Sequence, residues 1–292
     1  MDLLEQSKQL CNQYNIKPAR SKGQNFLIDE KIYDKIVNSA ELNKNNVILE
    51  VGPGLGFLTE KLARKVKKVI TVELDDKLTN YLKTALIAKK INNVEVINED
   101  IMKLDIGYQI LRKKHTNIQY PMSNFKVVAN LPYNITSIFL RKFLSADKKP
   151  NIMVLMLQKE VAERIVASPG KMSLLAVSVQ YYAKPEIVSY VEKQNFWPEP
   201  AVDSAIINLT PRPSLLNRRG GKKDNEDKKR FFQLVKFGFS AKRKMLKNNL
   251  AGSFRISQTE AEDKIKKAGF SEKIRAQELS VSDWVKLLGE FE

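Results

Sequence analysis

Five short apolar segments between residues 47 and 157 most constrain how this chain can fold. They are rich in Val, Ile and Leu, and helical patterns or turn signals separate them. The predicted strands are Val47–Val51, Val69–Glu73, Val94–Ile97, Phe125–Ala129 and Ile152–Leu157. The predicted helices between and before them are 30–41, Phe57–Ala63 and Lys77–Ala88. Strands alternating with helices predict an α/β fold, a Rossmann-like parallel sheet with helices on both faces. Its ligand would lie beyond the carboxyl ends of the strands.

The C-terminal part departs from this alternation. The apolar runs Pro185–Val191 and Ala205–Leu209 lack a clear crossover and are predicted as an antiparallel edge. The stretch Arg218–Lys229 has no apolar residue, which is typical of a linker. Four helical patterns follow: Phe231–Phe239, Lys242–Leu250, Gln258–Ala268 and Ser282–Leu288. We therefore predict a Rossmann-like domain with an N-terminal extension over 1–212, a charged linker over 213–230 and a small helical domain over 231–292. Polar residues 106–124 are predicted to form a surface insertion.

Charge narrows the choice of partner. The chain has 292 residues, with 50 Lys and Arg against 33 Asp and Glu, a formal net charge of +17. This surplus favours nucleic acid, because Lys and Arg contacts with phosphate release counterions; a merely solvated basic surface is the alternative. A single cysteine, Cys11, excludes an internal disulfide and a multi-cysteine metal site, and we expect no metal. The single histidine, His115, lies in a polar stretch. No membrane span or secretory leader is visible, so a cytoplasmic protein is expected.

A glycine-rich turn follows the first predicted strand, in the run Glu50-Val51-Gly52-Pro53-Gly54-Leu55-Gly56. Gly52 and Gly54 allow a tight turn and a close approach of the backbone to a nucleotide-like cofactor. The spacing is G-x-G-x-G, not the G-x-G-x-x-G of dinucleotide enzymes, and plain turn chemistry is the alternative.

Acidic residues stand at the ends of successive predicted strands. Glu73 is placed to accept hydrogen bonds from two ribose hydroxyls, and a helix cap is its alternative role. Asp100 could accept from an adenine amino group, and Glu50 is placed to face a cationic cofactor. A dehydrogenase would use the same sheet, but it would want a proton donor near the hydride. The sulfonium and amino groups of S-adenosylmethionine fit these acids better.

The tetrad Asn130-Leu131-Pro132-Tyr133 follows the fourth predicted strand. The Asn130 side-chain oxygen and the Leu131 carbonyl could each accept one hydrogen of an adenine N6 amine. That would aim the nitrogen lone pair in line with a methyl donor, which is catalysis by orientation and electrostatics. Tyr133 offers a stacking face, and Phe196 is the candidate second aromatic for a base unstacked from RNA. The alternatives are a buried turn for the tetrad and a hydrophobic plug for Phe196.

A basic cluster in the predicted helical domain is a candidate phosphate-binding face. It consists of Lys242, Arg243, Lys244 and Lys247. An ordinary solvated helix face is the alternative.

With these motifs in order, the chain resembles the KsgA-type ribosomal RNA adenine dimethyltransferases, from about Lys22 to Pro211 and more loosely beyond. Lys22–Leu27 resembles the family's N-terminal motif, and Phe196–Ser204 its later F-x-P-x-P-x-V-D-S motif. Phe239–Lys244 resembles the opening of its RNA-facing domain. The resemblance implies that the cofactor is bound by Asn25, Leu27, Gly52, Glu73, Asp100 and Asn130.

The resemblance also implies a reaction and a substrate. S-adenosyl-L-methionine would donate four methyl groups to two adjacent adenosines near the 3′ end of small-subunit rRNA, in a partly assembled subunit. We expect a monomer that acts away from membranes. One alternative is a large-subunit rRNA methyltransferase of the macrolide-resistance type. Leu131 disfavours this alternative, because isoleucine is usual at that position in those enzymes. Another is a non-catalytic assembly factor, which the intact Asn130, Tyr133, Glu73 and Asp100 disfavour.

Overall fold

A computed structural model describes residues 1–18, 23–104, 125–132, 135–213, 216, 222–241 and 243–291. The predicted insertion over 106–124, Tyr133 and Lys242 therefore lie outside the described residues. The chain divides into two compact units. The first comprises Met1–Ala162 and Glu186–Pro211, and the second Glu163–Pro185 and Arg212–Glu292. None of the helices in the described ranges is long and apolar enough to cross a membrane.

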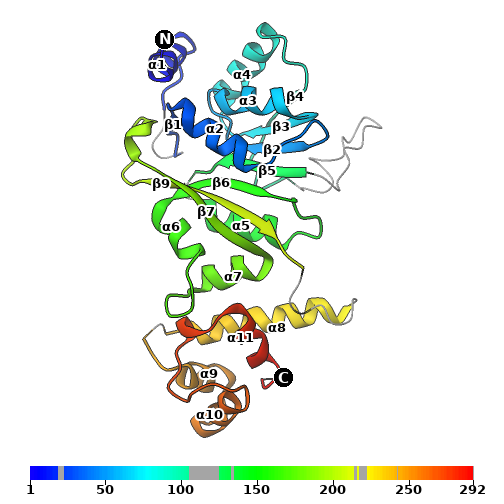
Figure 1. Ribbon diagram of the computed structural model, residues 1–292, viewed down its shortest axis with the longest axis vertical. Coiled ribbons are helices and arrows are strands. Elements are labelled where there is room, and N and C mark those ends of the chain that lie inside the picture. The colour runs from blue at the N-terminus through cyan, green and yellow to red at the C-terminus, as the bar shows by residue number, and fades with distance from the viewer. Residues whose placement is uncertain are drawn as a thin grey trace. The chain divides into compact units, whose positions relative to one another are not determined.

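A seven-stranded sheet in the order β4-β3-β2-β5-β6-β9-β7 forms the centre of the described part of the first unit (Figure 1). Its strands are β2 (Val47–Val51), β3 (Lys68–Glu73), β4 (Val94–Asn98), β5 (Phe125–Asn130), β6 (Met153–Gln158), β7 (Ala183–Val191) and β9 (Ser204–Pro211). The strands from β2 to β6 pair in parallel, whereas β9 runs antiparallel to β6. The predicted parallel sheet is thus confirmed. The two later predicted strands lie side by side at its edge, where β9 is antiparallel to β6. Every residue of β2 is buried, which explains why four of its five residues are Val, Ile or Leu; the fifth is Glu50.

Helices flank the sheet, and a small two-stranded ribbon lies apart from it (Figure 1). The helices are α1 (Leu3–Gln13), α2 (Glu30–Ser39), α3 (Phe57–Lys65), α4 (Asp76–Ala88), α5 (Thr136–Ser145) and α6 (Lys159–Ile165). The ribbon pairs β1 (Phe26–Leu27) antiparallel with β8 (Phe196–Trp197). Carboxylates begin three of the helices: Asp2 accepts from the first turn of α1, Asp29 from that of α2 and Asp75 from that of α4. Each such cap satisfies backbone donors that the helix itself cannot.

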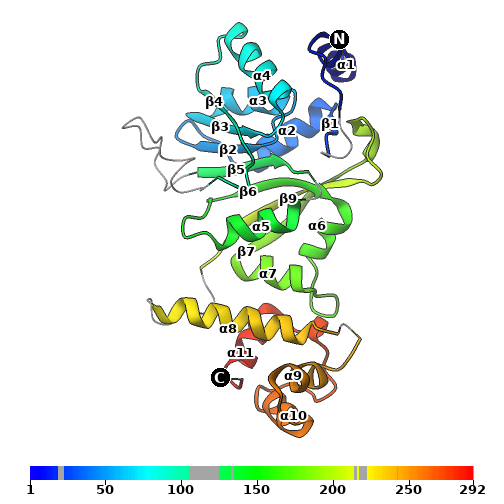
Figure 2. The ribbon, with the colours of Figure 1, turned by 180° about the vertical axis from the view of Figure 1, so that it is seen from behind.

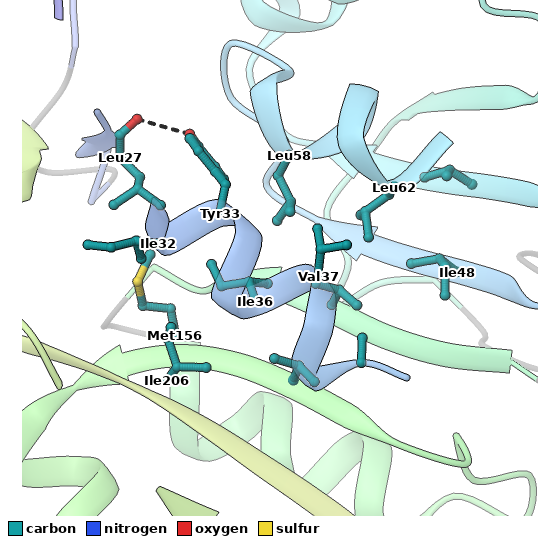
Figure 3. Packing of buried hydrophobic residues seen from close by; sticks show 14 of the residues in the cluster. Leu27, Ile32, Tyr33, Ile36, Val37, Ile48, Leu58, Leu62, Met156 and Ile206 are labelled. Carbon is teal, nitrogen blue, oxygen red and sulfur yellow. Dashed lines mark hydrogen bonds between the residues drawn. The ribbon is translucent and has the colours of Figure 1, made fainter. Parts of the chain in front are cut away.

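The apolar face of α2 packs into the main core of the first unit (Figure 3). Ile36 and Val37 meet side chains of α3 and the sheet, including Leu58, Leu62, Ile48, Met156 and Ile206. Full burial of each aliphatic side chain contributes about 1.5–3 kcal/mol. The Tyr33 hydroxyl donates to the Leu27 carbonyl at 2.9 Å, which ties α2 to the short ribbon strand β1.

The described part of the second unit is helical (Figure 2). It contains α7 (Leu174–Tyr182), α8 (Lys222–Gly238), α9 (Leu246–Phe254), α10 (Gln258–Lys267) and α11 (Val281–Leu288), with a 3-10 turn at Ala276–Glu278. Its core gathers Tyr181, Phe231 and Trp284, all fully buried. The Trp284 ring leaves no room for a side chain at Gly238, since a Cβ there would lie 2.2 Å from its Cη2 atom.

The second unit differs from the prediction at its start. Helix α8 begins at Lys222, so a linker over 213–230 does not hold for residues 222–230. Buried Phe231 and Leu234 anchor the helix, and its charged N-terminal turns extend from that anchor. Helix α7 also belongs to this unit, because the Tyr181 and Phe231 rings lie 4.7 Å apart. Helix α9 starts at Leu246, later than the predicted start at Lys242.

Candidate active site at the carboxyl ends of the strands

A cavity of about 450 Å³ opens in the first unit where β2, β3 and β5 end. This size suits a nucleoside-sized ligand, because small-molecule sites span about 300–1,000 Å³. The residues predicted to bind the cofactor all line it: Asn25, Leu27, Gly52, Gly54, Glu73, Asp100 and Asn130. Gly52, Gly54, Glu73, Asp100 and Asn130 come together because parallel strands end at the same edge of the sheet. Asn25 and Leu27 reach the cavity from the N-terminal segment and the ribbon strand β1.

The glycine turn after β2 allows close approach at two positions. Gly54 has a φ of +56°, and a Cβ there would lie 3.1 Å from the Phe26 ring. Gly56 caps α3 with a φ of +82°, and a Cβ there would lie 2.5 Å from Leu82 Cδ1. Both positions exclude other side chains, by conformation and by space. The turn therefore packs tightly against Phe26 and Leu82 at these two positions, of which Gly54 lines the cavity.

Glu73, the last residue of β3, is anchored by the backbone around it. Its Oε2 accepts from the Gly54 N–H at 3.3 Å, and its Oε1 from the Asp75 N–H at 2.9 Å. Burial raises the pKa of this carboxyl, while the same two N–H groups lower it. The helix cap considered as an alternative role for Glu73 is supplied by Asp75, which accepts from Lys77 and Leu78. Glu73 is thus held at the cavity wall as an acceptor.

Glu50 is the most deeply buried acid at the cavity, with 1% of its surface exposed. The Thr59 hydroxyl donates to its Oε2 at 2.7 Å, whereas its Oε1 has no hydrogen-bond partner among the described residues. Burial raises the pKa of Glu50 to about 7; the Thr59 hydroxyl and the neighbouring Thr71 hydroxyl lower it, and the nearby Glu73 charge raises it further. A buried acceptor without a donor is costly, so this oxygen suits a cationic or ammonium ligand.

Asp100 and Ile101 form the end of the cavity that follows β4. Asp100 Oδ1 accepts from the Met102 N–H at 2.8 Å, and its carbonyl accepts from the Lys103 N–H at 2.9 Å. These bonds make a compact turn. The Ile101 side chain is buried, as expected of an apolar cover over an aromatic ring.

Asn130 ends β5 on the cavity wall. Its Nδ2 donates to the Asn25 carbonyl at 3.4 Å, which turns the amide so that its oxygen is available to accept. The Leu131 N–H donates to the Met156 carbonyl at 3.2 Å, which fixes the corner to β6. Pro132 also lines the cavity.

The remaining predicted residues stand in different surroundings. Phe196 is 3% exposed and packs in the hydrophobic cluster, paired with Leu27 across the ribbon. Its predicted stacking role stays a prediction. In the second unit Arg243 and Lys244 are exposed, but Lys247 Nζ lies 2.6 Å from Glu262 Oε2. An ion pair of this kind competes with a phosphate for Lys247.

Together the parallel sheet, the glycine turn and the acids at the strand ends define a Rossmann-like S-adenosyl-L-methionine-dependent methyltransferase. The chain belongs to the ribosomal RNA adenine dimethylase family, whose model matches residues 15–292. It is therefore an enzyme that transfers methyl groups from S-adenosyl-L-methionine to adenine in ribosomal RNA.

Individual relatives cover nearly the whole chain. A protein named ribosomal RNA small subunit methyltransferase A from Dehalococcoides mccartyi is 39% identical over 97% of this chain and 91% of its own. One of the same name from Clostridioides difficile is 40% identical over 95% and 92%. Among solved structures, a dimethyladenosine transferase from Plasmodium falciparum matches with a TM-score of 0.72 and 27% identity, covering 91% of this chain and 97% of that one. The 23S rRNA methyltransferase ErmE matches with a TM-score of 0.70 and 27% identity, covering 91% and 99%.

Proposed function

We propose that this enzyme places two methyl groups on N6 of each of two adjacent adenosines near the 3′ end of small-subunit rRNA. Relatives named for the small subunit share 39% and 40% identity with it, against 27% for ErmE, which is named for 23S rRNA. We further propose that it works as a monomer, in the cytoplasm, on a partly assembled small subunit.

The residues around the cavity fit S-adenosyl-L-methionine part by part. The orphaned Glu50 Oε1 suits a positively charged amino group, and Glu73 suits the ribose hydroxyls. Asp100 would accept from the adenine amino group beneath the cover of Ile101. Asn25, Leu27, Gly52 and Gly54 would close around the remainder with backbone and apolar contacts. When bound, this cofactor supplies a methyl group on a cationic sulfur, ready for transfer to a nucleophile.

The orientation of the Asn130 amide is the observation that carries the proposed chemistry. An adenine N6 amine is a weak nucleophile because its lone pair is delocalised into the ring. With Nδ2 engaged by the Asn25 carbonyl, Asn130 Oδ1 would be left to accept from the incoming base. Accepting one N6 hydrogen there, and another at the Leu131 carbonyl, favours a pyramidal nitrogen with its lone pair directed at the methyl group. Each transfer adds one methyl to N6 and releases one proton to solvent.

Aromatic and basic residues would hold the RNA. We propose that Tyr133 stacks on one face of the target adenine. Phe196 either stacks on the opposite face or supports the residues that stack there. Lys242, Arg243 and Lys244 are proposed to contact phosphates. The pairing of Lys247 with Glu262 favours a structural role for Lys247 instead.

The test supplies labelled S-adenosyl-L-methionine with small and large subunits that lack N6 methylation. The modified base is then mapped by reverse-transcription stops. Stops at two adjacent adenosines near the small-subunit 3′ end are expected. Stops confined to large-subunit rRNA would instead assign the resistance-type function, and cofactor binding without transfer to either subunit would favour an assembly factor.

A further inference from the structure

Lys142, on α5, holds the loop that closes the adenine end of the cavity. Its Nζ donates to three backbone carbonyls of that loop, those of Ile101, Met102 and Leu104, at 3.1, 2.7 and 2.6 Å. An ammonium group has three donors and no acceptor, so three converging carbonyls match its geometry. Charge-assisted bonds of this kind are among the stronger ones in a protein.

The loop gains a long-range anchor from this contact. The bonds that Asp100 accepts are local, from the N–H groups of Met102 and Lys103, and they shape the turn without fixing it to the rest of the unit. Asp100, Ile101 and Met102 all line the cavity. Lys142 joins this loop to the helix that begins just after the Asn130 corner. Lys142 lies in the last turn of that helix, so a side chain about 40 residues away in sequence holds the loop to the body of the first unit.

We propose that Lys142 is a positioning residue that keeps the 100–104 loop in its cofactor-binding conformation. The proposal rests on the assignment of Asp100 and Ile101 to the cofactor adenine. If the loop is only partly populated in the binding conformation, the apparent dissociation constant rises in inverse proportion to that population. A positioning residue of this kind does not touch the reacting atoms, so transfer at saturating cofactor should be spared.

Lys142→Met is the informative change, because it keeps the apolar stem and removes the donors. We expect the dissociation constants for S-adenosyl-L-methionine and S-adenosylhomocysteine to rise about tenfold. Binding of adenosine, which carries the adenine and the ribose but lacks the methionine part, should weaken by the same factor. The KM for the cofactor should rise in parallel, with kcat within about twofold of the original. Lys142→Arg, which restores a cation with several donors, should recover most of the affinity.

Lys126 offers a matched control in the same unit. Its Nζ donates to the carbonyls of Ala40 and Glu41 at 2.8 and 2.6 Å, and it stands near the start of β5, at the far end of that strand from Asn130. Lys126→Met therefore removes the same kind of bond away from the cavity. It should lower thermal stability and leave cofactor affinity unchanged.

Calorimetric titration of the full-length variants with S-adenosylhomocysteine and with adenosine tests the positioning role. An unchanged affinity in Lys142→Met, or an equal loss in Lys126→Met, would overturn it. If Lys142→Met does not fold, Lys142→Gln gives the same comparison with a shorter, neutral donor. Asp100→Ala separates the two hypotheses: if it binds both ligands normally, the adenine assignment fails, whereas a loss there with normal Lys142→Met binding refutes Lys142 alone.

Discussion

Replacing Glu50 by Gln should make the protein more stable and a poorer binder of its cofactor. The Glu50 carboxyl is completely buried, and burial raises its pKa from the ordinary 4.5 to about 7. Ionising it in the folded state is therefore unfavourable. A difference of this size corresponds to about 3 kcal/mol between the two protonation states.

The direction of the Glu50 pKa shift determines the pH range in which the two proteins differ in stability. Because the folded pKa lies above the unfolded one, the carboxyl imposes no penalty below pH 4.5. The penalty grows as the pH rises toward the folded pKa of about 7 and is complete above it. Gln does not titrate. Glu50→Gln should therefore match the original near pH 4.5 and exceed its free energy of unfolding by up to about 3 kcal/mol at pH 8.

The affinity for the cofactor should fall in Glu50→Gln, whereas the free energy of unfolding should rise. A cationic ligand needs the ionised carboxylate, so the original protein must release a proton to bind below pH 7. Its dissociation constant should then rise by up to about tenfold for each pH unit below 7, while that of Glu50→Gln stays weak and flat. Urea unfolding and calorimetric titration between pH 5 and 8 measure both quantities. A variant less stable than the original at pH 8, or a flat affinity profile in the original, would refute the reasoning.

Three further expectations follow from the site and the second unit. Asn130→Ala should abolish methyl transfer yet keep cofactor affinity within about threefold, and full activity would remove Asn130 as the N6 acceptor. Gly238→Ala should destabilise the protein by about 1–3 kcal/mol, seen as a lower melting temperature, because its Cβ would strike Trp284. Neutralising Arg243 and Lys244 together should weaken rRNA binding and reduce the slope of log affinity against log salt by about two; an unchanged slope would place the RNA contact elsewhere.

The central strands were predictable from the sequence because they are buried on both faces. β2 is apolar apart from Glu50 and β6 is apolar up to its last residue, and the structure has both strands within one residue of the expected bounds. Helices α5, α6 and α7 were not predicted. In α7 apolar residues occur on nearly every side, so no polar face marks it as a helix. Nor could the start of α8 be placed, since its first turns are charged and only buried residues further along stabilise it.

The cavity residues could be predicted because chain topology alone brings strand ends together. Gly54, Glu73 and Asp100 each stand at or just beyond the end of a strand, and no tertiary detail was needed to expect them at one site. The long-range contacts had no such signal. Two such contacts are the hydrogen bond from Asn130 to the Asn25 carbonyl and those from Lys142 to a loop about 40 residues earlier. Both depend on tertiary packing, which residue spacing in the sequence does not predict.

The contact between Gly54 and Phe26 has a consequence for how this enzyme can change over generations. The glycine turn and the N-terminal motif are separate stretches of sequence. The Phe26 ring of the N-terminal motif nevertheless occupies the space that a side chain at Gly54 would need. A mutation at Gly54 would meet both an unfavourable backbone angle and this ring, so a smaller residue at Phe26 would relieve only half of the conflict. Substitutions in the two motifs therefore depend on one another, and a mutant library that randomises one motif should vary the other with it.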